Sequence, residues 1–308
     1  MKAFVTGCCG FIGSHLTERL LKEGFEVIGI DCFTDYYSRE IKEQNLENIS
    51  EENFYFMEKD IMDLDEFPEV DYVFHQSAQA GVRKSWGKEF EIYANYNIMA
   101  TQKLLEFYKA RGLKKFVYAS SSSVYGDSEL PMREDNRLLP ISPYGVSKLA
   151  GENLCYLYWK NFGVPTVSLR YFTVYGERQR PDMAMHKFIR SIMDGEEITV
   201  FGDGEQTRDF TYVGDIVESN LLAARSDLRG EILNVGGGSR ISVNSMIKVL
   251  EGILGREAKV RYVEKQKGDV RDTLADTNKI ERLLGWKPEV TIEEGLKREV
   301  EWIKKSFQ

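Results

Sequence analysis

Two side chains in the middle of the chain have types and spacing that permit acid–base chemistry. Tyr144 and Lys148 are four residues apart in the segment PISPYGVSK, which ends at Lys148. Residues four apart in a helix lie on one face, so the ammonium group can stabilise a phenolate. Ser142 and Pro143 suit the N-cap and the first position of such a helix. The pair predicts a tyrosine that acts as general base and then general acid, in preference to a packing tyrosine beside a solvated lysine.

A row of hydroxyls lies upstream of this pair, in the segment ASSSSVYG, residues 119–126. The four serines follow an apolar run that predicts a buried strand. Hydroxyls at a strand end either donate hydrogen bonds to a ligand or merely terminate the strand, and the row alone fits both interpretations. Beside a Tyr–Lys pair, the row favours a catalytic site. The sequence indicates no role for Ser120.

A third motif, TGCCGFIG at residues 6–13, follows the first predicted strand and begins a helix. Gly7, Gly10 and Gly13 have the spacing of a tight turn on which a pyrophosphate can lie against a helix N-terminus. Asp31 ends the next predicted strand, where its carboxylate can accept from both hydroxyls of a ribose. Because that carboxylate would repel a 2′-phosphate, NAD is favoured over NADP. The other predicted cofactor contacts are Phe11, Ile12, Asp60, Ile61, Gln76, Ser77, Ala78, Asn97, Phe172, Tyr144 and Lys148.

These motifs need a scaffold in which strands and helices alternate. Short apolar runs lie at about 2–6, 26–30, 53–57, 71–74, 115–119 and 166–170, and helical periodicity lies at 12–23, 90–111 and 144–162. The alternation predicts an α/β fold with a Rossmann-type, doubly wound parallel sheet. We expect residues 1–170 to form the NAD-binding domain and residues 171–308 a smaller, mixed α/β substrate-binding lobe. Part of 212–235 is expected to return to the main sheet.

Composition narrows the class of protein. The chain has 308 residues with a net charge of −8, which argues against nucleic acid and anionic membranes as partners. No apolar run is long enough to cross a bilayer, and the N-terminus begins as a strand rather than a signal peptide. The four cysteines and three histidines lack metal-ligand spacing. We expect a cytoplasmic protein without a structural metal.

Taken together, the motifs resemble those of the extended short-chain dehydrogenase/reductase superfamily, and within it the nucleotide-sugar epimerases and dehydratases. The glycine motif, Asp31, Ser-x-x-Val-Tyr-Gly, Tyr144-x-x-x-Lys148 and GDGEQTRDF at 202–210 occur in the same order. The resemblance implies tightly bound NAD, and Ser121 as the catalytic hydroxyl. It also implies that Tyr144 deprotonates the sugar 4-hydroxyl while C4 gives a hydride to NAD⁺. A homodimer formed through the predicted helices at 90–111 and 144–162 is a further implication.

The residues after Ser121 discriminate between reactions. The 4,6-dehydratases that the chain resembles carry Asp-Glu where this chain has Ser122 and Ser123. A hydroxyl with an ordinary pKa cannot replace that acid–base pair, so epimerisation at C4 is favoured over elimination. The segments QAGVR at 79–83, RYFTVYG at 170–176 and RPDMA at 180–184 are similar to those of UDP-glucuronate 4-epimerases. UDP-glucose 4-epimerases usually carry Asn in place of Thr173.

UDP-glucuronate to UDP-galacturonate is therefore the favoured reaction. The alternatives are a UDP-glucose or UDP-N-acetylglucosamine 4-epimerase, a UDP-glucuronate decarboxylase and a non-catalytic NAD-binding protein. We expect Ser122, Ser123 and Thr173 to form directional hydrogen bonds to the uronate carboxylate, although the two serines could instead only cap the strand. Arg208 is expected at the diphosphate, where Gln266 replaces an arginine usual in the family and Lys267 or Arg271 are candidate substitutes. The predicted substrate contacts are Ser121, Ser122, Ser123, Thr173, Arg180, Thr199, Phe201, Arg208 and Arg271.

Overall fold

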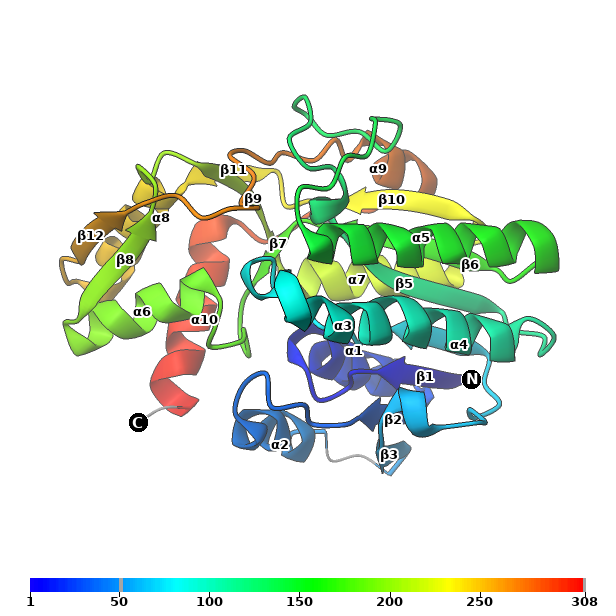
Figure 1. Ribbon diagram of the computed structural model, residues 1–308. Coiled ribbons are helices and arrows are strands. Elements are labelled where there is room, and N and C mark those ends of the chain that lie inside the picture. Colours follow the sequence, from blue (N-terminus) through cyan, green and yellow to red (C-terminus); the bar gives the residue numbers. More distant parts are fainter. Residues whose placement is uncertain (50–51, 307–308) are drawn as a thin grey trace.

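A seven-stranded parallel sheet forms the centre of the molecule in the computed structural model, which describes residues 1–49 and 52–306 (Figure 1). The strand order is β10-β6-β5-β4-β1-β2-β3, and every neighbouring pair is parallel. The strands are β1 (Lys2–Thr6), β2 (Glu26–Asp31), β3 (Phe54–Glu58), β4 (Tyr72–His75), β5 (Lys115–Ser121), β6 (Thr166–Tyr171) and β10 (Glu231–Val235). The predicted Rossmann-type sheet is confirmed, and β10 lies beside β6 at its edge.

Helices cover both faces of this sheet. On one face lie α4 (Ala100–Tyr108) and α5 (Pro143–Phe162), and on the other lie α1 (Phe11–Lys22) and α7 (Val213–Arg225) (Figure 1). Strand β5 shows why: its successive side chains alternate between the two faces. Phe116 and Tyr118 belong to the hydrophobic cluster under α4 and α5, and Val117 and Ala119 belong to the cluster under α1 and α7. By the same alternation, Ser120 lies on the α5 face.

The long helix predicted at 90–111 is interrupted. It consists of α3 (Phe90–Tyr93), a π-helical segment (Ala94–Met99) and α4. The π segment contains Asn97, which is buried and directs its amide toward the loop after β4. Single π turns often occur at functional sites because they re-aim one side chain, and this irregularity leaves no trace in the periodicity of the sequence.

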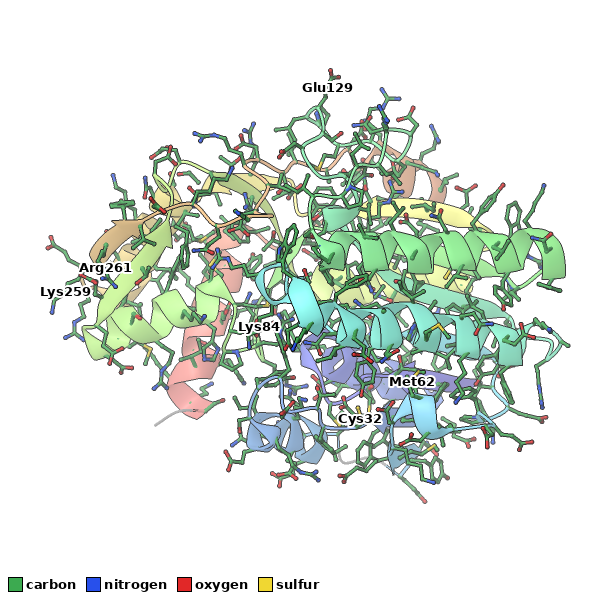
Figure 2. All side chains as sticks on the ribbon, in the orientation of Figure 1. Cys32, Met62, Lys84, Glu129, Lys259 and Arg261 are labelled. Carbon is green, nitrogen blue, oxygen red and sulfur yellow. The ribbon has the colours of Figure 1, made fainter. Side chains whose placement is uncertain are left out.

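Beyond β6 the chain builds a second region with two small sheets. One contains β7 (Thr173–Tyr175), β9 (Thr207–Tyr212) and β11 (Ser239–Ser242), and the other contains β8 (Glu197–Phe201) and β12 (Lys259–Val263). Its helices are α6 (Ala184–Asp194), α8 (Val243–Leu254), α9 (Asn278–Leu284) and α10 (Ile292–Ser306). Lys259 and Arg261 of β12 lie at the outer end of this region, whereas Lys84 lies near the centre of the molecule (Figure 2).

Shorter elements complete the path. They are α2 (Arg39–Glu47) and the 3₁₀ turns Ile61–Asp63, Arg83–Ser85, Gly87–Glu89 and Ser122–Val124. Across residues 1–49 and 52–306, no helix combines the length and apolar character needed to cross a membrane. Within the same ranges, no cluster of three or more His, Cys, Asp or Glu side chains could hold a metal ion.

Candidate active site

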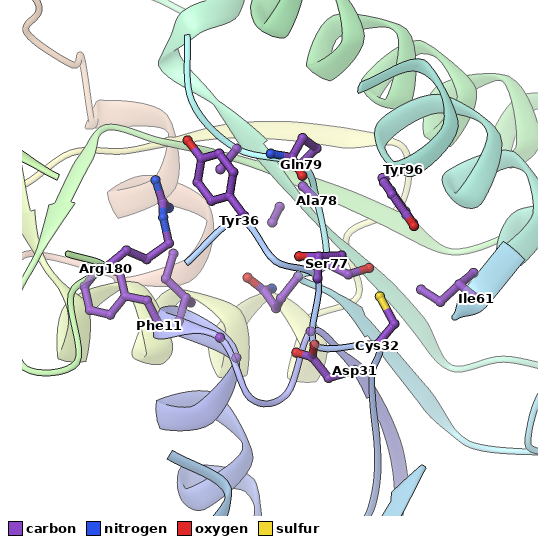
Figure 3. Close-up of a pocket in the computed structure, with 18 of the residues that line it drawn as sticks. Phe11, Asp31, Cys32, Tyr36, Ile61, Ser77, Ala78, Gln79, Tyr96 and Arg180 are labelled. Carbon is purple, nitrogen blue, oxygen red and sulfur yellow. The ribbon is translucent and has the colours of Figure 1, made fainter. Parts of the chain in front are cut away.

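A cavity at the carboxyl ends of the central strands gathers most of the predicted cofactor contacts. Ligands of open parallel sheets bind in this place. The wall of this first cavity includes Gly7, Gly10, Phe11, Ile12, Gly13, Asp31, Asp60, Ile61, Gln76, Ser77, Ala78, Tyr144 and Lys148. Figure 3 shows Cys32 and Ile61 toward one end of the cavity, and Tyr36 and Arg180 together toward the other.

The glycine turn has the geometry that a pyrophosphate requires. Gly7 has a φ of +69°, and a Cβ atom at Gly13 would lie 2.0 Å from the carbonyl oxygen of Gly7. Neither position therefore accepts a side chain. Helix α1 has no side-chain cap and no acidic residue in its first turn. Its first N–H groups and its positive end are directed at the cavity, where an anionic phosphate is stabilised.

Asp31 lies at the end of β2, at the position expected for a ribose carboxylate. Its two oxygens accept from the backbone N–H of Phe33 at 2.9 Å and of Cys9 at 3.3 Å, which fixes the carboxylate. Burial raises the pKa of Asp31, and these N–H groups together with the Lys42 ammonium oppose that rise. The carboxylate keeps unused lone pairs for a diol. The glycine cradle and Asp31 together fit NAD.

Two predicted cofactor contacts do not reach the cavity wall. Asn97 is buried, where it accepts from the N–H of Gln79 and donates to the Gln79 carbonyl and to Ser147. It therefore shapes the loop after β4 rather than lining the cavity. Phe172 follows β6 and is buried in a small cluster with Val124 and Tyr125. Its ring packs under the serine-rich strand end because β5 and β6 are neighbours.

The predicted catalytic side chains meet beside this cavity. Ser142 caps α5 by accepting from the N–H of Gly145 at 3.1 Å, with Pro143 in the first turn. Tyr144 and Lys148 then project from one helical face into the cavity wall. Ser121, at the end of β5, lies close enough to Tyr144 for its hydroxyl to favour the phenolate and so act on the pKa of the phenol. Chain segments far apart in sequence thus bring together the base, its hydroxyl partner and the ammonium group.

Burial has the largest effect on the pKa values of Tyr144 and Lys148. It raises the pKa of Tyr144, although the hydrogen bond with Ser121 and the charge of Arg180 oppose the rise. Burial also lowers the pKa of Lys148 to about 8, although its neighbours Cys155 and Glu152 oppose this shift. The chain's own groups therefore do not lower the pKa of the phenol toward neutrality. Bound NAD supplies a hydride acceptor and a positively charged ring at this place.

A second cavity lies between the two regions of the molecule. Of the predicted substrate contacts, its wall contains Thr173, Arg180, Thr199, Phe201, Arg208 and Arg271. The Arg83 guanidinium lies 4.2 Å from the ring centre of Phe201 and forms an ion pair with Asp269 at 2.8 Å. Arg180 and Tyr36 line both cavities, so the two sites adjoin.

The expected diphosphate contact is a half-buried arginine. Arg208 donates to the carbonyl oxygens of Thr207 and Arg271, both at 2.8 Å, which holds its guanidinium in the cavity wall. Burial lowers its pKa, although the carboxylates of Asp269 and Asp272 oppose this. Of the two substitutes for the arginine missing at Gln266, Arg271 lines the cavity and Lys267 does not.

Ser122 and Ser123, like the predicted substrate contact Ser121 before them, lie outside the walls of both cavities. They form a 3₁₀ turn in which the N–H of Ser123 donates to Ser121 Oγ at 3.1 Å. The start of α5 packs on this turn, since a Cβ atom at Gly145 would lie 2.4 Å from the Ser123 carbonyl oxygen. The turn therefore holds the Ser121 hydroxyl and helix α5 in one unit.

Tyr36 and Ser120 line the first cavity although no motif in the sequence indicates them. Tyr36, from the loop after β2, donates to Asp182 Oδ2 at 3.3 Å, and Arg180 donates to both Asp182 oxygens. A Cβ atom at Gly81 would lie only 2.3 Å from the Tyr36 hydroxyl oxygen, so the loop after β4 needs glycine at this position. A strand-end serine and a loop tyrosine are common in any sequence, so only the folded chain reveals these positions.

Comparison with known proteins identifies relatives along the whole chain. The sequence model of the GDP-mannose 4,6-dehydratase family matches residues 4–299. A protein of Bacillus subtilis named as an uncharacterized UDP-glucose epimerase, YtcB, is 44% identical and covers 100% of this chain and 99% of its own. A UDP-glucuronate 4-epimerase of Thermodesulfobacterium geofontis is 42% identical over 99% of this chain and 96% of the relative.

Solved structures agree with this placement. The crystal structure of UDP-glucuronic acid 4-epimerase from Bacillus cereus, in complex with UDP-glucuronic acid and NAD, superposes with a TM-score of 0.97. The two sequences are 43% identical, and the match covers 100% of both chains. The resemblance inferred from the motifs is confirmed: the chain belongs to the extended short-chain dehydrogenase/reductase family, in the group described by the GDP-mannose 4,6-dehydratase model.

Proposed function

We propose that the protein is an NAD-dependent nucleotide-sugar 4-epimerase that interconverts UDP-glucuronate and UDP-galacturonate. The observation that carries the proposal is the position of Tyr144 and Lys148 in the wall of the cavity that also holds the glycine turn and Asp31, and that adjoins a second, arginine-lined cavity. The names of the relatives and the ligands of the Bacillus cereus enzyme support the same activity.

In this proposal each group of the chain has a defined task. Tyr144 removes the proton of the sugar 4-hydroxyl and later returns it, with Ser121 holding the same oxygen by a hydrogen bond. Lys148 keeps a positive charge near the phenolate, which it stabilises. Arg208 and Arg271 bind the diphosphate, because planar guanidinium groups suit phosphate oxygens. The 4-keto sugar rotates between removal and return of hydrogen at C4, which inverts that carbon.

Loss of water from the sugar is disfavoured by the residues beside Tyr144. A dehydratase needs an acid and a base at C6 and C5, whereas this chain offers Ser122 and Ser123 in a turn outside the cavity walls. Because these two serines lie outside the cavity walls, we look for the uronate carboxylate contact among other hydroxyls. Thr173 lies in the wall of the second cavity, and we assign it the hydrogen bond to the uronate.

The Arg180 charge is relevant to the choice of sugar. Oxidation at C4 turns a uronate into a β-keto acid, which readily loses CO₂ unless the carboxylate is held out of alignment. Asp182 binds Arg180 at 2.9 and 3.1 Å, so the guanidinium is restrained at the boundary of the two cavities. Restraint of this kind fits an epimerase whose sugar substrate keeps its carboxylate during the reaction. The name of the Bacillus subtilis relative favours UDP-glucose as the second candidate substrate.

Quaternary structure and location are also proposals. We propose a homodimer that buries the outer faces of α3, the π segment, α4 and α5. Exposed apolar residues support it: Ile92 on α3, Met99 in the π segment, and Val146 and Leu157 on α5. We propose a cytoplasmic location, which the four free cysteines support. We propose that residues 1–170, together with β10, form the NAD-binding domain. The remainder of 171–308 forms the nucleotide-sugar domain.

Parallel assays with UDP-glucuronate and UDP-glucose test the activity. We expect a higher kcat/KM for UDP-glucuronate, with the 4-epimer as product and no CO₂. Faster turnover of UDP-glucose would show that the preferred substrate is the neutral sugar and not the uronate. Release of CO₂ with a UDP-pentose product would indicate a decarboxylase. Stoichiometric consumption of NADH would indicate a net reductase, and either result would refute the epimerase.

A further inference from the structure

Ser120 carries a buried hydroxyl that no group of the described chain satisfies. Its side chain is 3% exposed, and its Oγ atom has no hydrogen-bond partner. A buried polar atom in this condition loses its hydration without compensation, so native structures rarely retain one that has no function. The same residue lies in the wall of the first cavity, together with Tyr144 and Lys148.

The direction of this side chain follows from the strand. Tyr118 lies two residues before Ser120 in β5, and its hydroxyl donates to the Lys148 carbonyl at 3.4 Å. Its ring lies 4.6 Å from the Lys148 ammonium. Since residues two apart in a strand share a face, Ser120 lies on the face that carries Lys148. Arg170, its partner in β6, points the same way and reaches Glu152 on α5.

The two cationic groups on this face form no hydrogen bond with Ser120. Arg170 uses its Nε and both NH groups on Glu152, the Tyr125 hydroxyl and the Glu134 carbonyl. Within residues 1–49 and 52–306 the Lys148 ammonium has no hydrogen-bond acceptor, only the face of Tyr118. An unused hydroxyl and an unused ammonium therefore lie on one side of the cavity, beyond the base Tyr144.

We propose that Ser120 binds the cofactor: its hydroxyl forms a hydrogen bond, beside Lys148, with a ribose hydroxyl in the nicotinamide half of the dinucleotide. The class of ligand follows from the two donors, because a serine hydroxyl and an ammonium together match a neutral diol. The assignment rests on the proposed use of NAD. It gives a function to the serine for which the sequence indicated none, and it separates Ser120 from Ser121, whose hydroxyl contacts Tyr144.

The substitution Ser120→Ala makes two predictions of opposite sign. Removing the hydroxyl should weaken NAD binding by about 3- to 10-fold, which is the worth of one neutral hydrogen bond. The same change removes an unsatisfied buried polar atom, so the thermal midpoint of the NAD-depleted protein should stay equal or rise. A serine with only a structural role would show the reverse pattern, with a lower midpoint and unchanged affinity.

Ser168→Ala is the matched control. Ser168 lies in β6, is 2% exposed, and lies beside the Cys155 thiol, outside the wall of the first cavity. Its loss should leave NAD affinity unchanged while the thermal midpoint stays equal or falls. Comparing the two alanine variants separates the loss of a cofactor contact from the loss of any buried serine hydroxyl in this sheet.

Ligand fragments locate the contact. Affinities for NAD, ADP-ribose and AMP are measured by calorimetric titration of the NAD-depleted unaltered protein, Ser120→Ala and Ser168→Ala. We expect Ser120→Ala to weaken NAD and ADP-ribose alike and to leave AMP unchanged. Unchanged NAD affinity in this variant, or weakening of NAD without ADP-ribose, would overturn the assignment. If the unaltered protein binds no NAD, the proposed function itself fails, which is a distinguishable result.

Discussion

Arg170 on β6 and Glu152 on α5 form a two-point ion pair in which both side chains are only 1% exposed. Glu152 lies one helical turn beyond Lys148 and two beyond Tyr144 on the same helix. The pair therefore fixes the helix that carries the base against the strand next to β5. A third bond, from Arg170 to the Tyr125 hydroxyl at 2.8 Å, ties the segment after the serine row to the same arginine.

Breaking this pair should be costly to the fold. Glu152→Ala leaves the Arg170 guanidinium buried and unpaired, so the free energy of unfolding should fall by about 3–5 kcal/mol. Urea denaturation measures this loss. Asp135→Ala is the control, since the Arg133–Asp135 pair is 60% and 73% exposed and should change stability by about 1 kcal/mol or less. Similar losses in the two variants would contradict a structural role for the buried pair.

Lys148 should make stability depend on pH. Burial lowers its pKa from 10.5 to about 8, so between those values the unfolded chain holds a proton that the folded chain lacks. Unfolding then binds a proton, and stability of the NAD-depleted protein rises with pH through this window. Below pH 8 the buried ammonium lowers stability relative to a neutral side chain.

The substitution Lys148→Met removes that cost along with the activity. At pH 7 the NAD-depleted variant should be more stable than the unaltered protein by up to about 3 kcal/mol, and the difference should shrink toward pH 10.5. Urea denaturation at several pH values provides the measurement. A variant destabilised by the same amount at every pH would show that the buried Lys148 ammonium does not lower the free energy of unfolding.

Tyr144→Phe should separate chemistry from binding. The phenylalanine ring keeps the packing against Tyr93, whose ring centre lies 6.2 Å away, but cannot exchange a proton. We expect kcat to fall about 100- to 10,000-fold, with NAD content and the KM for UDP-glucuronate nearly unchanged. Steady-state rates and the NAD released on denaturation give both quantities. Full activity in this variant would refute Tyr144 as the base.

Tyr36 should control exchange of the cofactor. Its hydroxyl reaches Asp182 across the boundary between the two cavities, and it lines both. Tyr36→Ala removes this bridge, so labelled NAD should exchange about tenfold faster, a change of the size of one or two hydrogen bonds. Tyr55 is 54% exposed on β3, and Tyr55→Ala should leave exchange unchanged. Equal exchange in both variants would contradict the bridging role.

Local spacing explains what the sequence could predict. The glycine turn, Asp31 and the Tyr144–Lys148 pair lie within single strand–turn–helix units, where residue types fix geometry. Their places in the cavity wall follow from the order of strands in a parallel sheet. Arg208 belongs to the contiguous motif GDGEQTRDF and Phe201 directly precedes it, and both line the second cavity.

Tertiary packing explains what the sequence could not predict. Asn97 turns away from the cavity because a π segment rotates it toward Gln79 and Ser147. Ser122 and Ser123 fold into a turn beneath the start of α5, which no periodicity indicates. The bridge of Tyr36 to Asp182 joins residues 146 positions apart. The unpartnered state of Ser120 depends on what every neighbouring side chain does.

The fate of the hydrogen at C4 tests the epimerase account most directly. UDP-glucuronate deuterated at C4 is incubated with the enzyme in ordinary water, and the product is examined by NMR and mass spectrometry. The account predicts UDP-galacturonate that retains deuterium at C4, because the hydrogen leaves and returns as a hydride that does not exchange with water. Loss of the deuterium to solvent, or a pentose product with CO₂, would contradict it.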